Sequence, residues 1–151
     1  MIRAMTEKDL DEVMEIERLS FPTPWSHDHF RRELQMPQAR AFVAANARER
    51  IVGYICFWLV AEEAHILNLA VNPAERRQGI ATHILHFGLE YARKAGAEEA
   101  TLEVRRSNYP AVGLYRNFQF EPRGIRRRYY SDTGEDAVIM SRKLESDGSP
   151  Q

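Results

Sequence analysis

An α/β fold with one mixed sheet of six or seven strands is predicted by three features of the sequence. Short apolar runs rich in β-branched and aromatic residues recur along the chain, and such runs are typical of strands. Segments with a helical period lie between them, and the strand–helix–strand unit over 63–104 has the spacing of a parallel crossover. The chain has 151 residues, 44% of them hydrophobic, which suits one compact domain.

Two helices are predicted near the N-terminus. Thr6 and Asp9 match a capping box, and the helix over 7–19 has an apolar face formed by Leu10, Val13, Met14 and Leu19. After the prolines of FPTPWS a short helix starts at Ser26, flanked by a hydrophobic staple formed by Trp25 and Phe30. The acidic residues between 7 and 17 fit a solvated helix face, or secondarily a rim that attracts a basic protein.

The rest of the chain supplies the sheet. Strand-like runs lie at 40–46, 50–60, 63–71, 98–104, 118–123, 125–131 and 136–144. The first three predict an antiparallel meander, and the last two face each other across DTGE as a hairpin. Further helices are expected over 79–94 and 108–118. We expect the domain to span residues 1–144 and the polar end, 145–151, to be a flexible tail.

Composition excludes several classes of function. With 21 Lys and Arg against 22 Asp and Glu, the net charge of −1 gives no overall attraction to nucleic acid or to an anionic membrane. The segment RGIRRRYY, residues 123–130, has arginines and tyrosines that could contact RNA, but solvated arginines on a strand explain it better. The charged N-terminus lacks the apolar core of a signal peptide, and no apolar run approaches ~20 residues. We therefore expect a cytoplasmic protein.

No metal site is expected. The single cysteine, Cys56, lies in an apolar run, which predicts a buried thiol without a disulfide or metal role. His27 and His29 are two residues apart at a helix start, and His83 and His86 are three apart without the acidic companion of an HExxH motif, so neither pair has metal-ligand spacing.

The stretch VNPAERRQGIATHIL, residues 71–85, is the first candidate site. A helix start has unpaired N–H groups and the positive end of the helix dipole, so it attracts anions. Gly79 leaves the backbone bare there, and Arg76 and Arg77 add charge that a phosphate could engage. A solvated turn before an ordinary helix explains the same residues, and this stretch alone leaves both interpretations open.

The segment RRQGIA resembles the Arg/Gln-x-x-Gly-x-Gly/Ala pyrophosphate loop of the Gcn5-related N-acetyltransferases (GNAT), with Arg76, Gly79 and Ala81 in the defined places. LEVRRSNYPAVGLYRNFQF, FPTPWS and RRRYYSDTGEDAVIM resemble blocks of one subfamily, the bacterial ribosomal-protein-alanine N-acetyltransferases. The resemblance covers about residues 1–144. It implies a GNAT fold, in which two parallel strands, here LNLAV and TLEV, splay apart at the coenzyme A site.

The resemblance also implies roles for individual residues. A bulge in the first splayed strand would free backbone groups of Leu69, Ala70 and Val71 for the acetyl and pantetheine portion, although the side chains also fit simple core packing. Asn108 would contact the cofactor arm. The pyrophosphate would be wrapped by Arg76, Arg77, Gln78, Gly79, Ile80, Ala81 and Thr82.

Glu103 and Tyr115 match the positions of the base and the acid in the subfamily. A carboxylate can accept the amine proton, directly or through a water, and a phenol with an unperturbed pKa of ~10 can protonate the leaving thiolate. Without the resemblance, Glu103 fits a strand residue paired with Arg105, and Tyr115 fits a packing residue. Relatives usually have Gly where this chain has Gln119, so the end of the helix that carries Tyr115 could differ.

The predicted activity is acetyl transfer from acetyl-coenzyme A (acetyl-CoA) to the α-amine of a protein, in the first place a small-subunit ribosomal protein with an N-terminal alanine. The alternatives are acetylation of a small amine, such as a polyamine or an aminoglycoside, and a non-catalytic coenzyme A sensor or ribosome-binding module. The resemblance of FPTPWS and RRRYYSDTGEDA to blocks of the subfamily favours a peptide groove, and it implies that Tyr129 or Tyr130 lines this groove. We expect a monomer or a weak dimer that binds no nucleic acid directly and no membrane.

Overall fold

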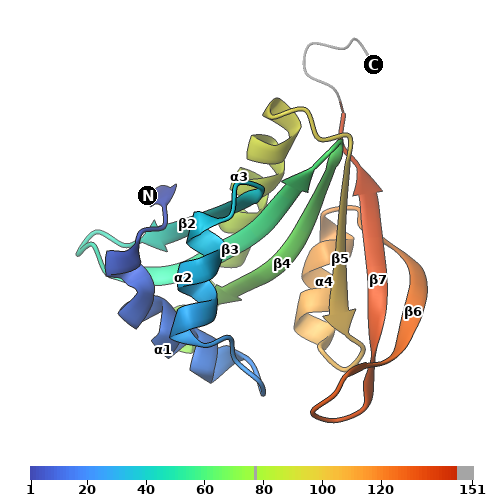
Figure 1. Cartoon of the computed structure of the whole chain (residues 1–151), viewed down its shortest axis with the longest axis horizontal. Coiled ribbons are helices and arrows are strands. Elements are labelled where there is room, and N and C mark those ends of the chain that lie inside the picture. The colour runs from blue at the N-terminus through green and yellow to red at the C-terminus, as the bar shows by residue number, and fades with distance from the viewer. Residues whose placement is uncertain (77, 146–151) are drawn as a thin grey trace.

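The computed structural model describes residues 1–76 and 78–145, which form a seven-stranded mixed sheet with helices on both faces (Figure 1). The strands are β1 (Ile2–Ala4), β2 (Ala39–Ala45), β3 (Ile51–Val60), β4 (Glu63–Val71), β5 (Glu99–Arg105), β6 (Glu121–Tyr130) and β7 (Glu135–Lys143). The helices are α1 (Leu10–Ser20), α2 (His27–Gln35), α3 (Ile80–Lys94) and α4 (Tyr109–Asn117), with 3-10 turns η1 (Glu7–Asp9) and η2 (Pro73–Glu75). The predicted α/β fold is confirmed.

The sheet order is β1-β2-β3-β4-β5-β7-β6. Strands β1 to β4 form an antiparallel meander. After β4 the chain crosses through α3 and returns as β5, parallel to β4, as the spacing predicts. Strand β7 then pairs antiparallel with β5, and β6 is the outer strand beside β7. The predicted meander, crossover and hairpin are therefore all present.

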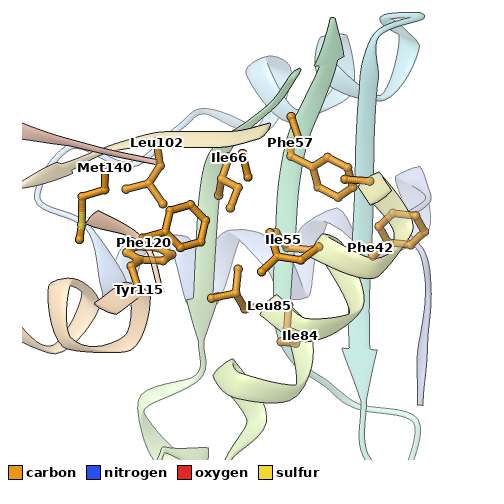
Figure 2. Close-up of a cluster of buried hydrophobic side chains, with 14 of the residues drawn as sticks. Phe42, Ile55, Phe57, Ile66, Ile84, Leu85, Leu102, Tyr115, Phe120 and Met140 are labelled. Atoms are coloured by element: carbon orange, nitrogen blue, oxygen red, sulfur yellow. The ribbon is translucent and has the colours of Figure 1, made fainter. Parts of the chain in front are cut away.

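Two hydrophobic clusters hold the helices on opposite faces of the sheet. In β3, alternate side chains point to opposite faces: Tyr54 and Cys56 pack with α1 and α2, whereas Ile55 and Phe57 pack with α3. Figure 2 shows the second cluster, in which Ile55 lies beside residues of α3. Because both faces are covered, β3 is apolar along most of its length.

The N-terminal segment follows its predicted signals with one correction. The Thr6–Asp9 capping box forms, and the rings of Trp25 and Phe30 make the staple with centroids 5.0 Å apart. The predicted apolar face of α1 is wrong at its end, because Leu19 is 66% exposed and Glu17, only 1% exposed, takes its place. Glu17 lies seven residues after Leu10, two helical turns along the same face.

Two further details differ from the sequence-based expectation. The three-residue strand β1, which was not predicted, pairs with β2 at one end of the sheet. The separate runs at 118–123 and 125–131 form one bulged strand, β6, which starts only at Glu121 because the preceding residues end α4.

Three smaller findings concern the remaining expectations. The thiol of Cys56 is buried, and burial raises its pKa. Within residues 1–76 and 78–145, no helix is long and apolar enough to cross a membrane, and no three His, Cys, Asp or Glu side chains form a cluster that could hold a metal. Arg77 and residues 146–151 of the predicted tail lie outside the described residues.

Candidate active site

The site is built where β4 and β5 separate. The two strands pair from Glu63 and Glu99 as far as Ile66 and Leu102, and then diverge, as Figure 1 shows. On the other side of β4, the register with β3 skips Leu67, so β4 contains a bulge at the point of divergence. Bulges release backbone groups from the ladder and often lie beside active sites. Both the splayed strands and the bulge were expected from the resemblance.

A pocket of about 340 Å³ opens at this divergence. It is lined by both splayed strands, by α4, by the segment between α1 and α2, and by the end of β6 and the turn after it. Glu103 from β5 and Tyr115 from α4 both line it, as do Leu69 and Asn108. The pocket thus brings together the two predicted catalytic residues and two of the predicted cofactor-binding residues.

Glu103 is held by a hydrogen bond from a neighbouring strand. The Nε2 atom of His65, on β4, lies 2.8 Å from Oε1 of Glu103, and Nε of Arg126 lies 4.0 Å from Oε2. The bond from His65 lowers the pKa of Glu103 despite its burial, so the carboxylate is ionised at neutral pH. The alternative pairing with Arg105 does not occur, because that guanidinium binds Asp132 at 2.6 Å instead.

Tyr115 is buried in the core and also lines the pocket, so its packing role and its predicted catalytic role are compatible. Its ring packs edge-on against Phe120, with centroids 5.6 Å apart (Figure 2). Burial raises the pKa of its hydroxyl, which therefore keeps its proton at neutral pH.

The end of α4 fixes the position of Tyr115. The amide N of Phe120 donates to the Tyr115 carbonyl at 3.0 Å, and that of Gln119 donates to Arg116 at 2.9 Å, which together form a Schellman motif. The motif needs a left-handed residue, and Gln119 adopts that conformation with φ 69°. The helix end therefore keeps the left-handed geometry for which relatives use glycine.

The predicted phosphate corner lies between β4 and α3. Gly79 is the N-cap of α3 with φ 75°, and a Cβ added to it would meet nothing within 4 Å. The backbone above this helix start is therefore open to a ligand. Arg76, Gln78 and Thr82 are exposed around it, and Ile80 and Ala81 form the first turn of the 15-residue helix. The geometry matches a pyrophosphate cradle, and each residue's role remains a prediction.

The other residues predicted to bind the cofactor have structural roles in the fold. Leu69, Ala70 and Val71 continue β4 beyond the bulge and pair with β3, and the last two are buried. Asn108 is the N-cap of α4, and its side chain accepts a hydrogen bond from the Ala111 amide at 3.3 Å. Since α4 carries Tyr115, Asn108 helps to position one side of the pocket.

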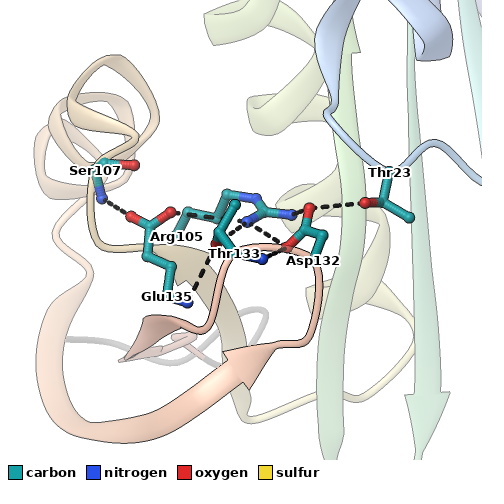
Figure 3. Close-up of polar contacts among 6 residues, drawn as sticks. All are labelled: Thr23, Arg105, Ser107, Asp132, Thr133 and Glu135. Atoms are coloured by element: carbon teal, nitrogen blue, oxygen red, sulfur yellow. Dashed lines mark hydrogen bonds and ion pairs between the residues drawn. The ribbon is translucent and has the colours of Figure 1, made fainter.

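A polar cluster joins two segments that line the pocket, on the side where the resemblance predicts the acceptor peptide (Figure 3). Asp132, in the turn between β6 and β7, accepts hydrogen bonds from Arg105 at 2.6 and 3.1 Å and from Thr23 at 2.7 Å. Arg105 and Thr23 lower the pKa of Asp132 to about 2. Because Thr23 lies between α1 and α2, this bridge ties two segments more than 100 residues apart in sequence. Tyr130, predicted for this side, lies under the Arg105 guanidinium at 4.0 Å.

Sequence reasoning missed a second carboxylate at the pocket. Glu17 accepts hydrogen bonds from Asn68 Nδ2 at 2.8 Å, from the Trp25 amide at 2.8 Å and from the Tyr54 hydroxyl. Burial raises its pKa. Glu17 thereby connects α1 to the residue beside the bulge and to the segment that carries Thr23. Its place on the apolar face of α1 was the available signal.

Comparison with known proteins agrees with this geometry. The sequence profile of the acetyltransferase (GNAT) family matches residues 10–120. A Bacillus subtilis protein named as a candidate [ribosomal protein bS18]-alanine N-acetyltransferase is 39% identical over 139 residues, which are 92% of each chain. The chain belongs to the GNAT family of acetyltransferases. An N-alpha-acetyltransferase of Saccharolobus solfataricus is 34% identical over 149 residues, covering 90% of this enzyme and 88% of the relative.

Solved structures place the fold in the same family. The crystal structure of the ribosomal-protein-S18-alanine N-acetyltransferase from Escherichia coli superimposes with a TM-score of 0.87 at 30% identity, over 100% of this enzyme and 97% of that chain. The donor substrate of such an enzyme is acetyl-CoA. The bulge in β4 and the open helix start at Gly79 are the places where the resemblance predicts that its thioester and its pyrophosphate bind.

Proposed function

We propose that this enzyme transfers the acetyl group of acetyl-CoA to the α-amine of the N-terminal alanine of ribosomal protein bS18, in the cytoplasm. The observation that carries the proposal is the meeting of Glu103 and Tyr115 in one pocket at the open end of the β4–β5 gap. The names of the relatives supply the acceptor, and the bridge between Thr23 and Asp132 gives the pocket two walls suited to an extended peptide.

The reaction has three chemical needs. An α-amine with pKa ~7.7 to 8.0 is mostly protonated at pH 7 and must lose its proton before it attacks the thioester. Glu103 is ionised and its side chain, although largely buried, lines the pocket, so it can take that proton, directly or through a water. The oxyanion of the tetrahedral intermediate can accept hydrogen bonds from backbone N–H groups at the bulge. Tyr115 keeps its proton until the departing thiolate, with pKa ~8.5, accepts it.

Ser20 is a polar residue of the pocket that a bound acceptor could satisfy. Its hydroxyl oxygen is buried and has no hydrogen-bond partner among the described residues, although the residue lines the pocket. A buried polar atom without a partner is costly, and the amide of a bound peptide would satisfy it. The N–H groups of a polyamine or the hydroxyls of an aminoglycoside could do the same, so Ser20 does not distinguish between these acceptors.

Peptide acetylation tests this proposal. The enzyme is incubated with acetyl-CoA and, in separate reactions, with four peptides and a polyamine. The peptides start with Ala, Ser or Met or carry an internal lysine behind a blocked N-terminus, and the products are identified by mass spectrometry. We expect acetylation at the free N-terminus, fastest for Ala. Acetylation of lysine side chains alone, or of polyamines in place of every peptide, would overturn the assignment.

A further inference from the structure

His65 and Glu103 form a pair across the two strands at the site. The imidazole Nε2 lies 2.8 Å from the carboxylate Oε1, and the Glu103 side chain is only 10% exposed, against 33% for His65. Glu103 lines the pocket, whereas His65 lines a separate surface hollow near the start of β4 and the end of α3. The pair therefore connects the site to a second region of solvent.

The hydrogen bond leaves the two carboxylate oxygens with different tasks. Oε1 is bound by His65, whereas the cation that pairs with Oε2 among the described residues, Arg126, lies 4.0 Å away, beyond hydrogen-bond distance. Oε2 is therefore the oxygen that can accept a proton from the substrate ammonium. A ring N–H that donates to one oxygen of an ionised carboxylate fixes the rotation of that carboxylate. His65 therefore determines which oxygen of Glu103 faces the substrate amine.

We propose that His65 is a positioning residue that presents Oε2 of Glu103 to the substrate amine and, by its own charge, sets how strong a base Glu103 is. This inference rests on the proposed function, because it assumes that Glu103 is the base. No atom is transferred to His65 in the reaction. The proton leaves the ammonium nitrogen and binds Oε2, while Nε2 stays hydrogen-bonded to Oε1.

The direction of the pH effect follows from the charges around the imidazole. Glu103 raises the pKa of His65 by its hydrogen bond and charge, Glu63 on β4 raises it further, and Arg126 on β6 lowers it. Below that pKa the imidazolium stabilises the Glu103 carboxylate and makes it a weaker base. Above that pKa the ring is neutral, and Glu103 accepts the amine proton more readily.

The test is the pH dependence of kcat/KM for an alanine peptide, in the wild-type enzyme and three variants. His65→Gln keeps an N–H donor but cannot titrate, His65→Ala removes both features, and His86→Gln is the same exchange at an exposed residue of α3. The ratio of kcat/KM at pH 6 to kcat/KM at pH 9 should be about three to ten times higher for His65→Gln than for wild type. His65→Ala should lose about tenfold at pH 9, and His65→Gln should recover most of that loss. The profile of His86→Gln should coincide with wild type.

A measurement without turnover completes the test. The pKa of the His65 imidazole, followed by NMR, should fall toward ~6.5 in Glu103→Gln, because the negative charge that raises it is gone. Coincident normalised profiles for wild type and His65→Gln, or an unchanged imidazole pKa in Glu103→Gln, would overturn the role of His65. If Glu103→Gln itself kept the wild-type rate, the proposed base would be wrong, and this outcome is separate from a failure of His65 alone.

Discussion

Replacing Gln119 by glycine should stabilise the fold and leave the site unchanged. Gln119 is exposed and has φ 69°, a conformation that costs a residue with a Cβ about 1 kcal/mol or more. Glycine removes this cost, but its greater conformational freedom in the unfolded chain lowers the free energy of unfolding by some tenths of a kcal/mol. The net gain is therefore about 0.5 to 1 kcal/mol, which raises the Tm of a domain of this size by roughly 1 to 4 °C.

Thermal unfolding followed by circular dichroism measures this gain, with Gln119→Ala as the matched control. Alanine removes the same side-chain atoms but keeps the Cβ, so its Tm should not exceed that of wild type. The Schellman hydrogen bonds involve only backbone atoms, so Tyr115 should stay in place and acetyl transfer by Gln119→Gly should be unchanged. If Gln119→Gly melts no higher than Gln119→Ala, the argument from backbone strain is refuted.

Three other predictions concern the substrates. Gly79→Val should weaken coenzyme A binding at least tenfold, because the new side chain fills the open space above the helix start. Arg76→Ala should weaken it by about 1.5 to 3 kcal/mol through lost charge-assisted hydrogen bonds. Unchanged affinities of both variants in calorimetric titration would exclude a pyrophosphate cradle. Tyr115→Phe should lower kcat by about 10²-fold while coenzyme A still binds, and this loss should be smaller with an acetyl thioester whose leaving thiol is more acidic. Equal losses with the two acetyl donors would mean that Tyr115 has only a packing role. Thr23→Val removes the hydroxyl that donates to Asp132, so the KM for the peptide in steady-state kinetics should rise about 2- to 10-fold at constant kcat. An unchanged KM would show that the bridge between Thr23 and Asp132 does not shape the acceptor site.

Local signals were enough to predict most of the fold. Periodicity and capping residues act within a few positions, which is why the Thr6–Asp9 box and the helix 79–94 could be read directly. Strand β1 could not, because its three residues are defined by pairing with β2 rather than by any pattern of their own. Glu17 was misread since a count of acidic residues ignores which face each one occupies.

Only the site residues that belong to sequence motifs could be predicted. The resemblance indicated Glu103, Tyr115 and the corner at Gly79, because these positions belong to motif blocks. His65 has no such signal: its contact with Glu103 depends on the register of two parallel strands, which the sequence of neither strand contains. The ties from Asp132 to Thr23 and Arg105 likewise arise only when distant loops meet.

The two outer strands of the sheet limit how copies of this enzyme can associate edge to edge. An exposed strand edge offers unpaired N–H and C=O groups, and another chain can extend the sheet there into an aggregate. At one edge β1 is only three residues long. At the other, the register of β6 shifts twice, Arg128 has φ 50°, and arginines follow one another along the strand. Two copies aligned along β6 would bring like charges together across a mismatched ladder, so both edges of the sheet disfavour growth of the sheet from one molecule into the next.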